Sequence, residues 1–139
     1  MNPLQSPAEY EAFVYTMQQH YSCVRRSTLT VIRHGATAAT LTGELDIDDY
    51  RFTVRETLSF AAEQGHIVSY GYEVWRGNEK QYWYDSQPHP DDAALAATAP
   101  HHKHVPPDIK HNRVPAPHLS FAKPNLPALI EEVERLRAE

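Results

Sequence analysis

The sequence predicts an α+β domain in which an antiparallel meander of about five strands is flanked by an N-terminal and a C-terminal helix. Apolar residues recur at helical spacing near both ends, and between them they alternate with a period of two, interrupted by short turn sequences. A chain of 139 residues has the length of one ordinary domain, so we expect a single core spanning residues 1–139. The expected order is an N-terminal helix within 1–22, the sheet within 23–86, a Pro/His-rich segment over 87–124 and a helix within 125–139.

Each expected helix combines a start signal with one apolar stripe. Residues 6–9 (SPAE) form a capping box with proline at the first helical position, which predicts a helix over 7–20. Asn125 is a candidate N-cap of the last helix. The first stripe consists of Tyr10, Phe13, Val14, Met17 and Tyr21. The second stripe consists of Leu126, Leu129, Ile130, Val133 and Leu136.

The expected strands cover residues 28–32, 41–47, 50–60, 67–76 and 80–85. The segment over 50–60 is the clearest, because apolar and polar side chains alternate throughout it. Gly43 interrupts the preceding alternation and suggests a β-bulge.

The last two strands form an aromatic hairpin. Residues 77–78 (GN) have the composition of a two-residue hairpin turn. Counting outward from this turn places Tyr72 opposite Trp83 and Tyr70 opposite Asp85. The hairpin therefore carries a carboxylate at its open end.

Composition excludes several classes of protein. No apolar run approaches the roughly 20 residues that cross a bilayer, and the first residues are neither basic nor apolar, so we expect a cytoplasmic protein without a secretory signal. Cys23 is the only cysteine, which excludes an internal disulfide or a multi-cysteine zinc site. A net charge of -5 argues against indiscriminate binding of nucleic acid.

Histidine and proline accumulate after the hairpin, with nine Pro and six His between Pro88 and Pro127. In an extended backbone, His102 and His104 point to the same side. Such a pair suits acid–base chemistry on a phosphodiester, with Lys103 neutralising phosphate charge. It equally suits a divalent transition metal held by His102, His104 and Asp85, with His89 or Glu56 as other possible ligands. Histidines in such a loop also serve simply as exposed groups or as loop anchors.

Further polar and aromatic residues are candidates for substrate binding. Glu56 interrupts the apolar face of its strand, which indicates a carboxylate in a cleft, a partly solvated face or an ion pair with arginine. The aromatic side chains of the hairpin could stack on single-stranded bases or pack in the core. The residues expected to contact a substrate are Tyr84, His89, His101, Lys110 and Arg113.

The step Tyr84-Asp85, followed by His102-Lys103-His104, resembles the TumE family of bacterial toxin–antitoxin toxins. The resemblance implies a small α+β protein with a cognate antitoxin as its partner and with RNA, or another part of the translation machinery, as its target. Carried over by position, it implies Asp85, His102, Lys103 and His104 as site residues. The proline-rich extension over residues 106–124 departs from shorter members of the family.

Three hypotheses follow from these observations. The leading one is a TumE-like toxin that acts on RNA as a ribonuclease without a cofactor, using His102 and His104 as acid and base. The second is a non-catalytic protein-interaction module built on the Pro/His-rich segment, because proline fixes the backbone before a partner docks. The third is a metal-dependent enzyme that uses His102, His104 and an acid.

Overall fold

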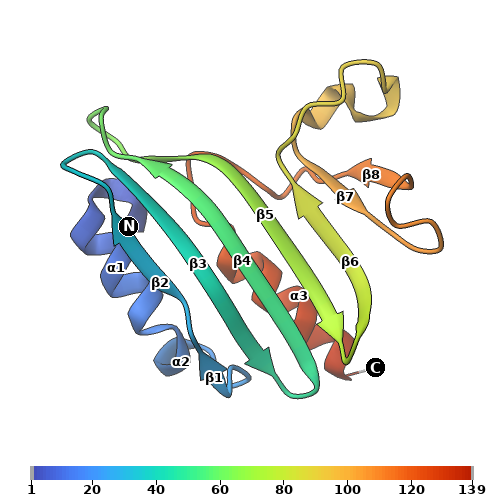
Figure 1. The fold of residues 1–139 in the computed structure, drawn as a ribbon, viewed down its shortest axis with the longest axis horizontal. Helices are drawn as coiled ribbons and strands as arrows, with labels where there is room; N and C mark the ends of the chain where they lie inside the picture. The colour runs from blue at the N-terminus through green and yellow to red at the C-terminus, as the bar shows by residue number, and fades with distance from the viewer. Residues whose placement is uncertain (1, 139) are drawn as a thin grey trace.

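An antiparallel sheet of eight strands forms the centre of the molecule, and the α-helices lie against one of its faces (Figure 1). The structure is a computed structural model that describes residues 2–138. Its elements are η1 (Pro3–Gln5), α1 (Pro7–Tyr15), α2 (Met17–His20), β1 (Arg26–Ser27), β2 (Thr30–Arg33), β3 (Ala38–Ile47), β4 (Tyr50–Ser59), β5 (His66–Arg76), β6 (Glu79–Asp85), η2 (Ala93–Thr98), β7 (His102–His104), β8 (Arg113–Pro115) and α3 (Leu126–Ala138).

The α+β class is confirmed, but the expected number of strands was too low. The strands follow the order β1-β3-β4-β5-β6-β7-β8, and β2 also pairs with β3. The strands beyond the five expected are β1, β7 and β8, which are two or three residues long, whereas β2 corresponds to the strand expected over 28–32. β1 and β2 share one partner, and β7 and β8 extend the sheet beyond β6 with residues of the Pro/His-rich segment.

The N-terminal helix starts where the capping box predicts and ends earlier than expected. The Ser6 hydroxyl accepts a hydrogen bond from the amide of Glu9 at 3.1 Å. A continuous helix over residues 7–20 was wrong, because Thr16 leaves the helical conformation (φ -106°, ψ 13°) and separates α1 from α2. The Thr16 hydroxyl donates to the carbonyl of Ala12 at 2.7 Å, a local bond that competes with regular helix.

The core lies between the sheet and the helices. Along β4, the side chains that face the helices are all buried, as the alternation predicted. These residues are Tyr50, Phe52, Val54, Glu56 and Leu58. The apolar stripe of α3 packs on the same side of the sheet (Figure 1). The opposite face of the central strands carries no helix among residues 2–138.

The hairpin between β5 and β6 has the expected turn but a different register. Arg76 pairs with Glu79, and a bulge at Gln81 then shifts every later pair by one residue. Tyr72 therefore lies opposite Tyr84, where the count from the turn gave Trp83. By the same shift Asp85 lies opposite Gly71, where the count gave Tyr70.

Gly43 allows a close backbone approach and does not form a bulge. β3 pairs with β4 without a shift of register at this residue. Its φ is +138°, and a Cβ atom there would lie 2.5 Å from the carbonyl oxygen of Thr28. The chain entering β2 thus crosses directly over Gly43, which fixes that edge of the sheet.

Candidate functional site

Strand β7 places two histidines beside the carboxylate that ends β6. His102 pairs with Asp85 and His104 pairs with Trp83, so the alternation of the strands puts all three polar side chains on one face. The Nε2 atom of His102 lies 2.9 Å from Oδ1 of Asp85, and Nε2 of His104 lies 3.5 Å from Oδ2. The two Nε2 atoms are 3.0 Å apart. The structure thus brings the histidines after Pro100 together with Asp85.

Backbone carbonyls fix the tautomers of both imidazoles. Nδ1 of His102 donates to the carbonyl of Pro100 at 2.8 Å, and Nδ1 of His104 donates to the carbonyl of Ile109 at 3.0 Å. A carbonyl oxygen can only accept, so each Nδ1 carries a proton. In the neutral rings both Nε2 lone pairs would face each other and the carboxylate. A proton or another cation between them relieves this repulsion.

The surroundings shift the pKa values of the two imidazoles in opposite directions. Burial lowers the pKa of His104 below its usual value, and the nearby His102 adds to this effect. Burial opposes charge on His102 too, but its hydrogen bond to Asp85, with the Pro100 carbonyl, raises its pKa overall. Burial likewise opposes charge on Asp85, yet the bond from His102 lowers the pKa of this carboxyl overall. These shifts favour a proton on His102 over one on His104.

His89 and Arg113 border the cluster. The His89 ring packs edge-on against His102, with 4.7 Å between ring centroids. Arg113 pairs with His104 across β7 and β8 and lies 4.0 Å from Asp92. The Nε atom of Arg113 is buried without a hydrogen-bond partner in the described part of the chain. Arg113 and His89 line one cavity of about 420 Å³ with residues 88–93.

Several predicted site residues lie elsewhere. Lys103 points to the helix side of the sheet, where its Nζ lies 3.1 Å from a carboxylate oxygen of Glu132. Tyr84 points the same way, and its hydroxyl donates to Glu132 at 2.9 Å. His101 also faces this side, bonded to the Tyr70 hydroxyl at 2.6 Å. Lys110 is exposed in the loop between β7 and β8. The structure therefore groups Asp85, His89, His102, His104 and Arg113 without these four residues.

Glu56 is neither solvated nor paired with an arginine. It is fully buried, and the hydroxyls of Tyr10 and Tyr72 donate to its carboxylate oxygens. Burial raises the pKa of this carboxyl. Glu56 lies on the helix side, away from Asp85, and is therefore a core residue.

One set of side chains could hold a metal ion. Asp85, His89, His102 and His104 each offer one ligand atom, and these atoms all lie within 4.8 Å of one another. The carbonyl bonds to both Nδ1 atoms are typical of the outer contacts that orient histidine ligands. Four protein ligands around one ion leave no open position, which is typical of structural zinc sites.

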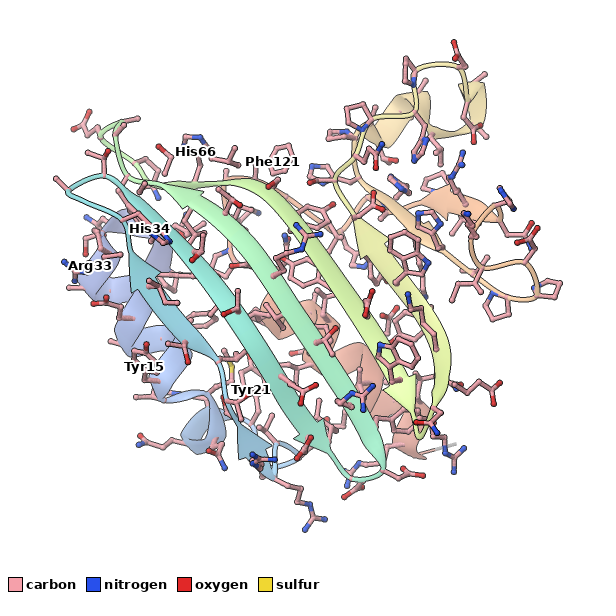
Figure 2. The ribbon with its side chains drawn as sticks, viewed as in Figure 1. Tyr15, Tyr21, Arg33, His34, His66 and Phe121 are labelled. Atoms are coloured by element: carbon pink, nitrogen blue, oxygen red, sulfur yellow. The ribbon has the colours of Figure 1, made fainter. Side chains whose placement is uncertain are left out.

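A larger cavity of about 690 Å³ opens beside Asp85, and its wall includes Arg55, which the sequence did not indicate as a site residue. Arg55, Trp83 and Ser86 line it, and Phe121 lies at the end of the sheet where β5 begins (Figure 2). The indole ring of Trp83 stacks on His104 with 3.7 Å between centroids. Arg55 appeared in the sequence only as one of several polar residues on the outer face of β4. Only the pairing of β4 with β5 and of β5 with β6 brings Arg55 near Asp85, and no local sequence pattern reveals this pairing.

The grouping of Asp85 with His102 and His104 is the arrangement that the short motif of the toxin family implied. A family model described as Toxin TumE matches residues 14–137. The chain belongs to the TumE toxin family. It is thus the toxin component of a toxin–antitoxin system, and an antitoxin is its implied partner. No curated protein and no solved structure matches this TumE-family chain. None of the helices within residues 2–138 is long and apolar enough to span a membrane.

Proposed function

We propose that this TumE-family toxin cleaves RNA by proton transfer through His102 and His104. The observation that carries the proposal is the convergence of both Nε2 atoms on Asp85, with both Nδ1 atoms fixed by backbone carbonyls. The opposite shifts in the pKa values of His102 and His104 favour one protonated and one neutral imidazole, the two forms that acid–base catalysis needs. Asp85 orients His102 and balances its charge.

The reaction would be a transesterification within the RNA strand. His104 takes the proton of a ribose 2′-hydroxyl, and the 2′-oxygen attacks the adjacent phosphorus. The bond from phosphorus to the 5′-oxygen of the next nucleotide breaks, and His102 donates its proton to that oxygen. The products are a 2′,3′-cyclic phosphate and a 5′-hydroxyl end. Arg113 supplies positive charge beside the histidines.

Access to the histidines is part of this proposal. His102 is 1 % exposed and His104 is 2 % exposed, and His89 packs against both rings. The proposal therefore requires the segment over residues 87–92 to move when RNA binds, as surface loops at active sites commonly do.

The test combines toxicity with analysis of RNA ends. Expression without antitoxin should stop growth and yield RNA fragments with cyclic phosphate ends. His102→Ala and His102→Gln should each abolish both effects while circular dichroism shows a folded protein. His111→Ala is the matched control, because His111 is an exposed histidine of the same segment. Full toxicity of folded His102→Ala and His104→Ala variants would overturn the acid–base assignment and favour action by binding alone.

A second candidate function is favoured by the set of four ligand atoms within 4.8 Å. In this alternative a divalent transition metal occupies the cluster and holds the Pro/His-rich segment in place. Elemental analysis of protein purified without a histidine tag decides between the two. Stoichiometric zinc, with a loss of thermal stability in chelator that His89→Ala reproduces, supports the metal. Metal-free protein of unchanged stability and full activity supports acid–base catalysis by His102 and His104.

A further inference from the structure

Arg55 belongs to the same cross-strand row as the candidate site. Arg55 on β4 pairs with Gly71 on β5, Gly71 pairs with Asp85 on β6, and Asp85 pairs with His102 on β7. Residues that follow one another along such a row lie on one face of a sheet. This is the face without helices (Figure 1), and Arg55 is exposed on it, whereas Asp85 and His102 at the other end of the row are buried.

Gly71 leaves the space through which Arg55 reaches toward Asp85. A Cβ atom on Gly71 would lie 2.3 Å from a terminal nitrogen of the Arg55 guanidinium. The end of the guanidinium therefore fills the space that a side chain at residue 71 would take, on the strand that lies between β4 and β6. Any side chain at residue 71 would occupy this position.

The Arg55 guanidinium also lacks a carboxylate partner. It takes part in none of the ion pairs formed within residues 2–138. Arg51, on the same face of the same strand, contrasts with it. Arg51 pairs with Glu44 at 3.3 Å and lies 5.4 Å over the ring of Trp75. Arg55 thus keeps its donors free, and guanidinium donors match phosphate oxygens in geometry.

The cavity beside Arg55 has room for a nucleotide. Its volume of about 690 Å³ lies in the range typical of small-molecule sites. Asp85 forms part of its wall, but the charge of this carboxylate is balanced by His102 and by the amide of Gln87 at 3.0 Å. A smaller cavity of about 190 Å³ continues along Arg55, Glu73 and Trp83. The larger cavity therefore reaches from Arg55 to Asp85, the carboxylate that contacts both histidines.

We propose that Arg55, cradled by Gly71, binds a phosphate group of single-stranded RNA next to the Asp85–His102–His104 cluster. The inference rests on the proposed function, since it names the group that holds the substrate of that site. Arg55 is a binding residue on this account, and the histidines perform the proton transfers. A single strand fits because its flexible backbone can place one phosphate at Arg55 and the adjacent ribose at the cluster.

Binding of a non-cleavable probe tests the proposal separately from catalysis. The probe is a fluorescein-labelled, fully 2′-O-methylated oligonucleotide of mixed sequence, followed by fluorescence anisotropy at several salt concentrations. Arg55→Gln should weaken binding by about tenfold and reduce the salt slope by about 0.7, the value for one phosphate contact on a single strand. The matched control Arg51→Gln should change the affinity by less than about twofold, because this arginine already has partners.

Gly71→Ala provides an independent test with Arg55 present. The added methyl group meets only the far end of a flexible side chain, so the protein should stay folded while the guanidinium is displaced. Its loss of affinity should match that of Arg55→Gln, and the double variant should lose no more than either single variant. Additive losses would show that the two residues act separately, and they would overturn the claim that Gly71 positions the Arg55 guanidinium.

The outcomes distinguish this inference from the proposed function. Equal affinity of Arg55→Gln and Arg51→Gln, or no binding of the probe by the wild-type protein, overturns the role of Arg55. His102→Gln should keep binding the probe. If folded His102→Ala stays fully toxic while Arg55→Gln loses binding, the acid–base assignment fails and the phosphate contact stands.

Discussion

The Nζ atom of Lys103 lies 3.1 Å from a carboxylate oxygen of Glu132, on the helix side of the sheet. The ammonium group also lies 4.2 Å from the ring centroid of Tyr82. Lys103 stands between two histidines in the sequence, but strand alternation directs it away from them. Its contacts join β7 to α3 and are therefore structural.

Replacing Lys103 with methionine should lower stability and leave toxicity intact. The ion pair and the cation–π contact are both partly buried, so their loss should cost about 1 kcal/mol of unfolding free energy. Urea denaturation of the purified protein measures this change, and Lys123→Met at an exposed position is the control. A stable but non-toxic Lys103→Met protein would mean that Lys103 takes part in the toxic activity itself.

Glu56→Gln should stabilise the protein, and increasingly so as the pH rises. Burial raises the pKa of Glu56 in the folded state above its unfolded value of about 4.3. The folded protein therefore holds this proton more tightly, and the resulting stability is complete below the unfolded pKa and lost as pH rises through the folded pKa. A glutamine avoids this loss because it never ionises.

Urea titrations between pH 4.5 and pH 8, in roughly half-unit steps, check the prediction, with a growing difference of up to about 1.4 kcal/mol per pH unit within the window. Glu63→Gln, at an exposed turn, is the matched control. A constant difference at every pH would mean that Glu56 stays ionised between the hydroxyls of Tyr10 and Tyr72.

Regular elements could be predicted from the sequence because their own periodicity decides them. The stripe of α3 and the alternation along β4 each repeat often enough to fix one buried face. β7 and β8 have three residues each and lie among prolines, so their strand conformation depends on pairing with β6. The bulge at Gln81 has no marker in the sequence, and the register of the hairpin was therefore off by one residue.

The same distinction explains how much of the site was predictable. The spacing of His102 and His104 placed both on one side of an extended segment, and the structure confirms it. Their contact with Asp85 depends on the non-local pairing of β6 with β7. The position of Arg55 depends on pairing across three further strands and on the missing side chain of Gly71. Such relationships arise only after the sheet has formed.

Asn125 should prove to be a tether for the preceding loop and not a helix cap. Its Oδ1 accepts from the amide of Ser120 at 2.9 Å, and its Nδ2 donates to the Ser120 carbonyl and to the Tyr72 hydroxyl. Aspartate is an equally good N-cap but has no amide donors. We expect Asn125→Asp and Asn125→Ala each to lose about 2 kcal/mol of unfolding free energy. Near wild-type stability of Asn125→Asp would instead identify a cap.

Alanine scanning of glycines should separate backbone contact from backbone conformation. At Gly43 an added Cβ meets the backbone of Thr28, which cannot move aside, and φ is +138°. At Gly35 φ is +87° and the Cβ would enter open space. We expect Gly35→Ala to cost about 1 kcal/mol from its conformation alone and Gly43→Ala to cost about 3 kcal/mol or more. Thermal unfolding measures both. Equal losses of stability in the two variants would contradict the close approach of Thr28 to Gly43 at that edge of the sheet.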